Sequence, residues 1–422
     1  MERKKYEAYL AILKEELIPA MGCTEPIAVA YAAAVAAEAL GQPPQSAQVL
    51  VSANILKNVK SVIVPCTGGL RGIEAAVCAG LVSAAPEKGL EILSSVTDEQ
   101  RLQTAAMLKS VPIAVKASDN GRLFDIQVLV RAEGHTGFAQ ISGYHTNVVK
   151  VCRDDETILE KEYQEDRQEY ATDRSLLNVQ DIVAFAECVN TEDVSELLDR
   201  QIEYNTAIAE EGLRGQWGAQ IGRILLESYG GSVHNRAKAM AAAGSDARMS
   251  GCELPVVINS GSGNQGMTAS LPVIIYAEEL NVSRDTLLRA LVISNLITIH
   301  LKTGIGRLSA YCGAISAGCG AGAGVCYLYG GRDYEISHTI VNAIAINSGV
   351  ICDGAKASCA AKIASAVEAG LLGLQMQKKG RQFYGGEGIV QKGVENTIRN
   401  VGELARNGMR ETDRTIIEIM TR

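Results

Sequence analysis

The sequence has few aromatic residues, few histidines and no long apolar run. Aromatic residues make up 5% of the 422 residues, Trp217 is the single tryptophan, and there are five histidines. The most apolar stretch, residues 287–301, is interrupted by Arg289, Asn295 and His300, so no segment is predicted to span a membrane. The charged N-terminus does not resemble a signal peptide. We therefore expect a cytoplasmic protein without a membrane partner.

An excess of positive charge and several common site motifs are also missing. The formal net charge is −8, which argues against nucleic acid as a partner. No glycine-rich loop is followed by Gly-Lys-Ser/Thr, and no Gly-x-Ser-x-Gly elbow occurs, so a P-loop nucleotidase and a serine hydrolase are not indicated. The cysteines do not form the short Cys-x-x-Cys pairs of zinc ribbons and ferredoxins.

Cysteine and glycine are abundant instead, with 11 and 42 residues in a chain that is 47% hydrophobic. In a reducing compartment, so many cysteines indicate metal binding, catalysis or simple burial rather than disulfides. Segments rich in glycine and alanine predict helices that pack closely together.

The predicted fold class is α+β. We expect a mainly helical, cluster-binding catalytic domain formed by residues 1–44 and 180–422, and an inserted α+β domain with its linker at residues 45–179. Within the insert, strands are expected at 47–53, 59–64, 91–96, 113–117, 123–132 and 137–151, helices at 69–82 and 98–108, and a hairpin turn at 119–121. Residues 154–173 are charged and predict a linker or a surface helix.

Two thiols seven residues apart, Cys352 and Cys359, form the most informative stretch of the chain. Ser358 is a candidate N-cap, which places Cys359 in the first turn of a helix, where unpaired N–H groups and the helix dipole favour a thiolate. A third thiol, Cys312, directly precedes another expected helix start at Gly313. Three thiolates without a fourth ligand favour an open metal site, with one position left for a substrate. Inert burial of the thiols is the alternative.

Two more cysteines, Cys319 and Cys326, follow Cys312 at seven-residue intervals. Along a helix such neighbours lie about 10 Å apart, which is too far for all three to bind one compact metal centre. We therefore expect Cys319 and Cys326 to be part of the core.

A loop rich in glycine and amides, residues 259–266, precedes a helix that is expected to begin near Met267. Such a loop can present backbone N–H groups to a carboxylate or phosphate, and a plain turn is the alternative. The residues expected to bind substrate here are Ser260, Gly261, Asn264 and Gln265. His300, Lys302 and Arg307 add positive charge shortly before Cys312, either as an anion site that includes Arg307 or as a favourably charged helix end.

Taken together, several motifs resemble the L-cysteine desulfidases, which are relatives of the α-region of iron–sulfur-dependent L-serine dehydratases. The resemblance covers essentially the whole chain and rests on residues 21–26 (Met-Gly-Cys-Thr-Glu-Pro), 244–248 (Gly-Ser-Asp-Ala-Arg), 261–266 (Gly-Ser-Gly-Asn-Gln-Gly), 305–309 (Ile-Gly-Arg-Leu-Ser), 312–313 (Cys-Gly) and 352–359. It implies a [4Fe–4S] cluster that is held by Cys312, Cys352 and Cys359 and keeps one iron open. It also implies that Cys23 acts as a base or thiol participant. Lys356 and His300 are rival candidates for the catalytic base.

The reaction implied by this resemblance is the conversion of L-cysteine and water to pyruvate, ammonia and sulfide. A serine dehydratase of the same mechanism is the first alternative, because thiol and hydroxyl differ by one atom. A non-enzymatic iron–sulfur or thiol sensor and a metal-free protein with buried cysteines are the others. We expect a small amino acid as substrate and a homo-oligomeric protein.

Overall fold

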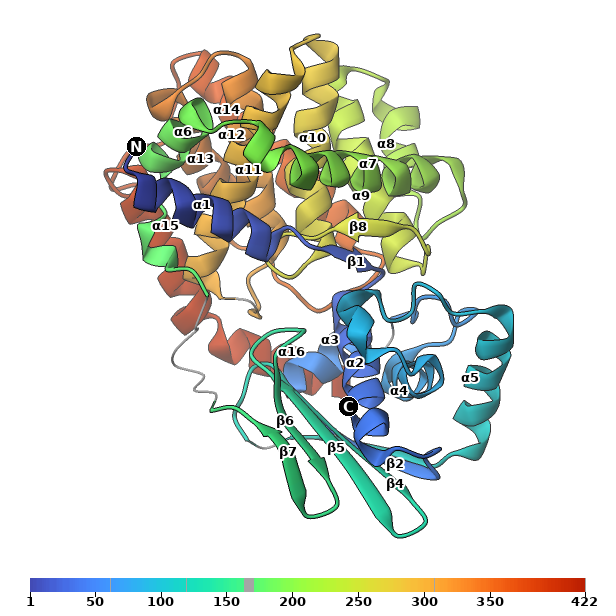
Figure 1. Cartoon of the computed structure of the whole chain (residues 1–422). Helices are drawn as coiled ribbons and strands as arrows, with labels where there is room; N and C mark the ends of the chain where they lie inside the picture. Colours follow the sequence, from blue (N-terminus) through green and yellow to red (C-terminus); the bar gives the residue numbers. More distant parts are fainter. Residues whose placement is uncertain (61, 119, 163–170, 307, 422) are drawn as a thin grey trace.

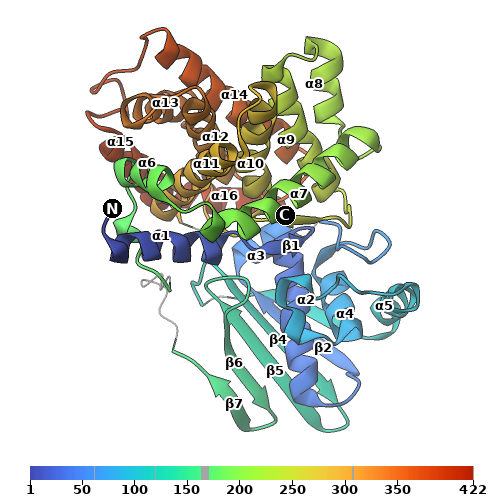
Figure 2. The ribbon, with the colours of Figure 1, turned by 45° about the horizontal axis from the view of Figure 1, so that its top comes forward.

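A computed structural model describes residues 1–60, 62–118, 120–162, 171–306 and 308–421 of the chain. A bundle of helices and a smaller α+β part lie side by side (Figures 1 and 2). This arrangement confirms the predicted α+β fold class. None of the helices in the described ranges is long and apolar enough to cross a membrane.

The α+β part is built on a six-stranded sheet with strand order β3-β2-β4-β5-β6-β7. Its strands are β2 (Ser46–Val51), β3 (Ile113–Ala117), β4 (Asp125–Ala132), β5 (His135–Ser142), β6 (Val148–Arg153) and β7 (Glu156–Glu160). Its helical segments are α2 (Thr24–Leu40), α3 (Ala53–Val59), α4 (Gly72–Ser83), the 3₁₀ segment η1 (Pro86–Glu91) and α5 (Asp98–Ser110). Strands β2 and β3 are parallel, and the other neighbouring strands of this sheet pair antiparallel.

Helix α2 is the buried element of the α+β part. It is rich in alanine and hydrophobic on nearly every side, as expected for a helix that is covered all round. It packs on β4 and β5 on one side and on α4 on the other. Its N-terminal end, which carries Cys23, points toward the helical bundle (Figure 1).

The helical part surrounds one glycine- and alanine-rich helix, α12 (Gly313–Leu328), which is buried along almost its whole length. Neighbours of α12 are α10 (Gly263–Glu279), α11 (Arg284–Ile305), α13 (Asp333–Ile346) and α14 (Cys359–Lys378). The remaining helices are α1 (Arg3–Glu16), α6 (Val179–Cys188), α7 (Glu192–Arg214), α8 (Ile221–Tyr229), α9 (Val233–Met249), α15 (Val394–Glu403) and α16 (Arg410–Thr421). Close helix packing is confirmed here, because a Cβ atom at Gly318 would lie 2.2 Å from the Ala366 carbonyl oxygen of α14.

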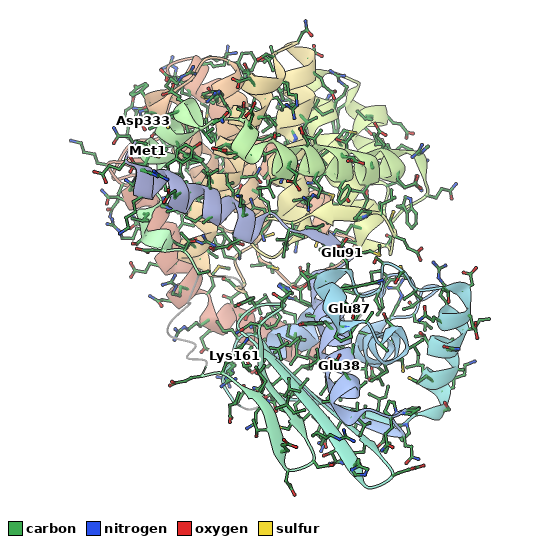
Figure 3. All side chains as sticks on the ribbon, viewed as in Figure 1. Met1, Glu38, Glu87, Glu91, Lys161 and Asp333 are labelled. Carbon is green, nitrogen blue, oxygen red and sulfur yellow. The ribbon has the colours of Figure 1, made fainter. Side chains whose placement is uncertain are left out.

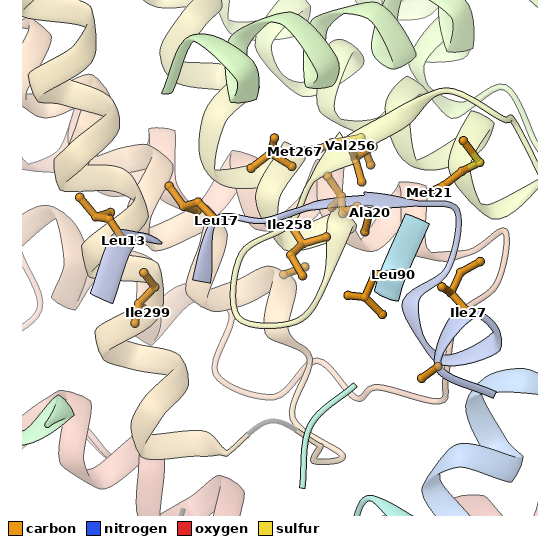
Figure 4. Close-up of a cluster of buried hydrophobic side chains, with 14 of the residues drawn as sticks. Leu13, Leu17, Ala20, Met21, Ile27, Leu90, Val256, Ile258, Met267 and Ile299 are labelled. Atoms are coloured by element: carbon orange, nitrogen blue, oxygen red, sulfur yellow. The ribbon is translucent and has the colours of Figure 1, made fainter. Parts of the chain in front are cut away.

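A two-stranded sheet forms where the two parts meet. Strand β1 (Pro19–Met21) pairs antiparallel with β8 (Pro255–Val257), although residues 19–21 carry no strand pattern of their own. Figure 4 shows the surrounding apolar contacts, with Val256 and Met267 on one side of β1 and Leu90 and Ile27 on the other. This apolar layer fixes the N-terminus of α2 against the helical bundle.

Several local predictions were wrong. The strand expected at 59–64 is not found in the described residues of that range: α3 extends to Val59, and Ile63 forms an isolated bridge with Arg71. The strand expected at 91–96 is replaced by η1, which ends at Glu91, and by turns. The run 137–151 is divided between β5 and β6, and part of the expected linker forms the edge strand β7. The hairpin turn includes residue 119, which lies outside the described residues, and β3 and β4 are not paired because β2 lies between them. Short apolar segments of this kind carry too little periodicity to separate strand from helix.

The division of the chain into two domains stays a prediction, but one element lies elsewhere than expected. We assigned residues 1–44 to the helical domain, whereas α2 packs on the sheet and on α4. The sequence pattern of α2 indicates only that it is buried, and not by which neighbour.

A thiol-lined cavity as candidate active site

A cavity of about 120 Å³ lies where the α+β part meets the bundle. The three predicted thiol ligands, Cys312, Cys352 and Cys359, line this cavity together with Cys23. They come from positions up to 336 residues apart in the sequence. Cys319 and Cys326 are buried within α12 away from the cavity lining, as predicted.

Backbone hydrogen bonds bring Cys312 and Cys352 together. Tyr311 and Ile351 form an antiparallel bridge, the N–H of Cys312 donates to the carbonyl of Val350 at 3.0 Å, and the N–H of Cys352 donates to the carbonyl of Ala310 at 2.6 Å. Cys312 immediately precedes α12 and occupies its N-cap position. These contacts give the two thiol-bearing segments a fixed register.

Cys359 occupies the first position of α14, after Ser358 at the N-cap, as the sequence predicted. The expected thiolate is not favoured, however, because burial raises the pKa of Cys359 more than the hydrogen bond from the Lys356 backbone lowers it. Burial and the neighbouring thiols Cys352 and Cys359 also raise the pKa of Cys312, to about 12. Three adjacent sulfur atoms in a buried cavity repel one another when ionised, so a cation is needed to hold them as thiolates.

The donor set distinguishes between kinds of metal centre. Within the described residues, no group of three or more His, Cys, Asp or Glu side chains could hold a metal ion, so a zinc-type site is not supported. In an iron–sulfur cluster each cysteine binds a different iron, and its ligands are therefore spread more widely than those of one ion. Three thiols that face one cavity from separate elements fit such a cluster.

The glycine- and amide-rich loop forms one wall of the same cavity. Ser260, Gly261, Asn264 and Gln265 all line it, but α10 begins at Gly263 rather than near Met267. Asn264 and Gln265 therefore lie in the first helical turn, where N–H groups lack intrahelical partners. The hydroxyl of Ser260 donates to Asn259 Oδ1 at 2.8 Å and thus holds the loop.

Arg248 lies across the start of α10, and sequence analysis did not place it in the site. Its Nη1 donates to Asn264 Oδ1 at 3.2 Å, and it fits there because residue 263 is glycine: a Cβ atom at Gly263 would lie 2.4 Å from Arg248 Nε. Gly313 similarly leaves room for Gln265, whose Cδ would be 2.6 Å from an added Cβ. The amide loop is thereby placed directly beside Cys312.

Four buried polar atoms that have no hydrogen-bond partner in the described part of the chain belong to residues of this cavity. They are Asn58 Oδ1, Arg248 Nε, Gln265 Oε1 and Tyr311 Oη. A buried polar group without a partner costs about 1–3 kcal/mol. Their concentration around one cavity indicates a polar ligand that satisfies them.

A carboxylate that sequence analysis did not select lies at the N-terminal end of α2. Glu25 Oε2 accepts hydrogen bonds from Cys23 Sγ at 3.2 Å and from Thr24 Oγ1 at 3.1 Å, and its Oε1 accepts from Asn58 Nδ2 at 3.1 Å. Burial acts to raise the pKa of Glu25, but His145, the Cys23 thiol and Arg248 lower it, and the net shift is downward. The one feature of the sequence that could have indicated Glu25 is its position in the motif at residues 21–26.

His145 comes from the turn between β5 and β6, so the α+β part contributes a side chain to the cavity. Its ring packs edge-on against Phe124 with 4.9 Å between ring centroids. The surrounding sequence, which the α+β pattern marked only as strand, gave no indication of this role.

Other predicted site residues lie away from the cavity lining. Lys356 forms an ion pair with Asp353 at 3.2 Å, and Lys362 of α14 lines the cavity in its place. His300 pairs with Glu395 at 2.8 Å, outside the lining. Arg307 lies outside the described residues.

The fold and cavity thus define a class: an α+β protein with a thiol-lined site between its two parts. Comparison with known proteins gives the family. Residues 87–418 match the serine dehydratase alpha chain family, a range that includes the three thiols and leaves out Cys23 and Glu25. The chain belongs to this family.

Relatives are similar along their whole length. A UPF0597 protein of Desulfitobacterium hafniense is 57% identical over 422 residues, which cover 100% of this chain and 98% of that protein. A UPF0597 protein of Lachnoclostridium phytofermentans is 50% identical, with 98% and 99% covered. One of Bacteroides thetaiotaomicron is 38% identical, with 100% and 98% covered.

Proposed function

We propose that the protein is an iron–sulfur-dependent lyase that converts L-cysteine to pyruvate, ammonia and sulfide. The observation that carries the proposal is the convergence of Cys312, Cys352 and Cys359 on one cavity that also contains the amide loop. Membership of the serine dehydratase alpha chain family supports a lyase of the serine dehydratase type. The three thiols would hold a [4Fe–4S] cluster.

When bound, the cluster supplies a Lewis acid that makes the β-substituent of the substrate a better leaving group. The chain itself binds and orients the amino acid. Its carboxylate is positioned by Arg248, Gln265 and the N–H groups at the start of α10, where positive charge and unpaired donors meet. Lys302 also lies in the lining and adds positive charge, whereas Lys57 and Lys362 are paired with Asp413 and Asp353.

Cys23 is our candidate for the base that removes the α-proton. Burial raises the pKa of Cys23 well above its usual value, and Glu25 raises it further, so the free protein holds a thiol. A base must be deprotonated, and turnover should therefore increase toward alkaline pH. Replacing Cys23 by Ala should abolish turnover while the iron content is kept, and full turnover of that variant would exclude the role.

A serine dehydratase with the same site is the second candidate, favoured by the family description. A thiol-based sensor is not favoured, because it has no need of the unpaired polar atoms that surround the cavity.

The test is an anaerobic purification followed by iron and sulfide analysis and separate assays of pyruvate from L-cysteine and L-serine. Four irons per chain with sulfide released from cysteine would establish the proposed activity. Turnover of serine alone would identify a dehydratase. Absence of both iron and turnover after cluster reconstitution would refute the proposal.

A further inference from the structure

Glu25 is held in one orientation by three different side chains. Cys23 and Thr24 donate to Oε2, and Asn58 donates to Oε1. The single hydroxyl proton of Thr24 is shared between Glu25 and the carbonyl oxygen of Gly261, which lies 3.0 Å from Thr24 Oγ1 and places Glu25 beside the amide loop of the helical part. A carboxylate fixed by so many donors presents its remaining lone pairs in a defined direction.

The carboxylate of Glu25 differs in charge from the other side chains of the cavity. Among the lining residues that the structure describes, it is the one acidic side chain. Lys57 and Lys362 pair instead with Asp413 and Asp353, which are not among the lining residues. Against the effect of burial, the nearby His145 and Arg248 lower the pKa of Glu25, so Glu25 carries a negative charge at the cavity.

The opposite charge lies on Arg248, which is close enough to Glu25 and Cys23 to interact with both electrostatically. Its guanidinium bonds to Asn264, and its Nε has no partner among the described residues. The cavity thus has an anionic pole on α2 and a cationic pole at the start of α10. An amino acid zwitterion, whose ammonium and carboxylate groups are attached to the same carbon, matches these two opposite charges.

We propose that Glu25 binds the α-ammonium group of the amino acid and restricts the site to substrates with a free amine. This inference rests on the proposed function and identifies the residue that binds the substrate amine. The ion pair keeps the amine protonated, and a cationic nitrogen on Cα makes the α-proton easier to remove. Glu25 then acts in binding, while the proton goes to another group.

Replacing Glu25 by Gln tests the assignment, because glutamine keeps the shape and loses the charge. We expect the KM for L-cysteine to rise about 10- to 100-fold, the effect of losing a hydrogen bond between charged groups, with a smaller change in kcat. Inhibition by 3-mercaptopropionate, which is cysteine without the ammonium group, should stay the same or become stronger. Glu38, exposed on α2 (Figure 3), provides the matched control, and Glu38→Gln should leave both constants unchanged.

Two outcomes would overturn the assignment. If kcat falls by about 100-fold or more while KM stays constant, Glu25 is the base, and equal weakening of cysteine and 3-mercaptopropionate would show a structural role. Titration calorimetry of the wild-type protein with L-alanine and propionate does not depend on turnover or on the folding of a variant. Tighter binding of alanine supports the inference even if neither cysteine nor serine is a substrate, and equal binding contradicts it.

Discussion

The contact between α12 and α14 provides a sharp prediction, because both helices begin at thiols of the cavity. In α14, Gly370 lies so close to α12 that an added Cβ atom would be 2.1 Å from the carbonyl oxygen of Gly318. Ordinary contact begins at about 3.4 Å, so the substitution Gly370→Ala leaves a deficit of about 1.3 Å. The obstructing atom is backbone, and a side-chain movement cannot relieve the clash.

The two helices must therefore separate by about 1 Å. Overpacking of this kind costs about 1–3 kcal/mol, which alanine partly offsets through its better helix propensity of about 0.5–1 kcal/mol. The effect on the site should be larger than the effect on stability. Cys312 precedes α12 and Cys359 begins α14, and a displacement of about 1 Å in a catalytic site can cost about 100-fold in rate.

The assay compares iron content after anaerobic reconstitution, pyruvate formation and unfolding temperature for Gly370→Ala and the wild-type protein. Gly304→Ala in α11 is the matched control, because its Cβ atom would meet its nearest neighbour, Gly402 Cα, at an ordinary 3.6 Å. We expect the control to retain iron and activity. If Gly370→Ala retains both as well, the reasoning from helix separation is wrong.

Two further predictions concern ion pairs. The Lys57 side chain is 2% exposed, and its ammonium lies 2.6 Å from the Asp413 carboxylate. Asp413→Ala leaves this ammonium buried without its partner, so we expect the free energy of unfolding to fall by about 3–5 kcal/mol, with a lower unfolding temperature. The loss should be smaller for Asp413→Asn. The hydrogen bond with His234, supported by Lys238, lowers the pKa of Glu368 to about 2. The ionised Glu368 therefore stabilises the folded protein above the unfolded-state pKa near 4.5, and this contribution disappears as the pH falls toward 2. The difference in unfolding temperature between wild type and Glu368→Gln should therefore shrink across that range, and a constant difference would contradict the assignment.

The thiols and the amide loop could be selected from the sequence because their chemistry is local. The spacing around Cys359 and the position of Cys312 before Gly313 both predicted helix starts, and α14 and α12 begin there. Helix content from Val179 onward was likewise readable, since long periodic segments carry a strong signal. The short segments at residues 59–64 and 91–96 could not be assigned correctly from the sequence, because their secondary structure depends on tertiary neighbours.

The ionisation of the site could not be predicted from residue type and position. At Cys359 the helix terminus favours a thiolate, but burial disfavours charge more strongly, and burial is a property of the folded chain. Lys356 and Lys362 illustrate the same point. Lys356 lies between the two thiols in the sequence and Lys362 follows them in α14, yet of the two only Lys362 is among the residues that line the cavity.

The sequence by itself determined the α+β class, the buried glycine-rich helices and the set of candidate thiols, because these follow from composition, periodicity and local spacing. Only the tertiary structure decided that α2 belongs beside the sheet and that Glu25, His145 and Arg248 face the thiols across one cavity. The physical reason is that these residues come from separate elements whose contacts depend on the complementary packing of entire surfaces. No local pattern in the chain encodes which surface meets which.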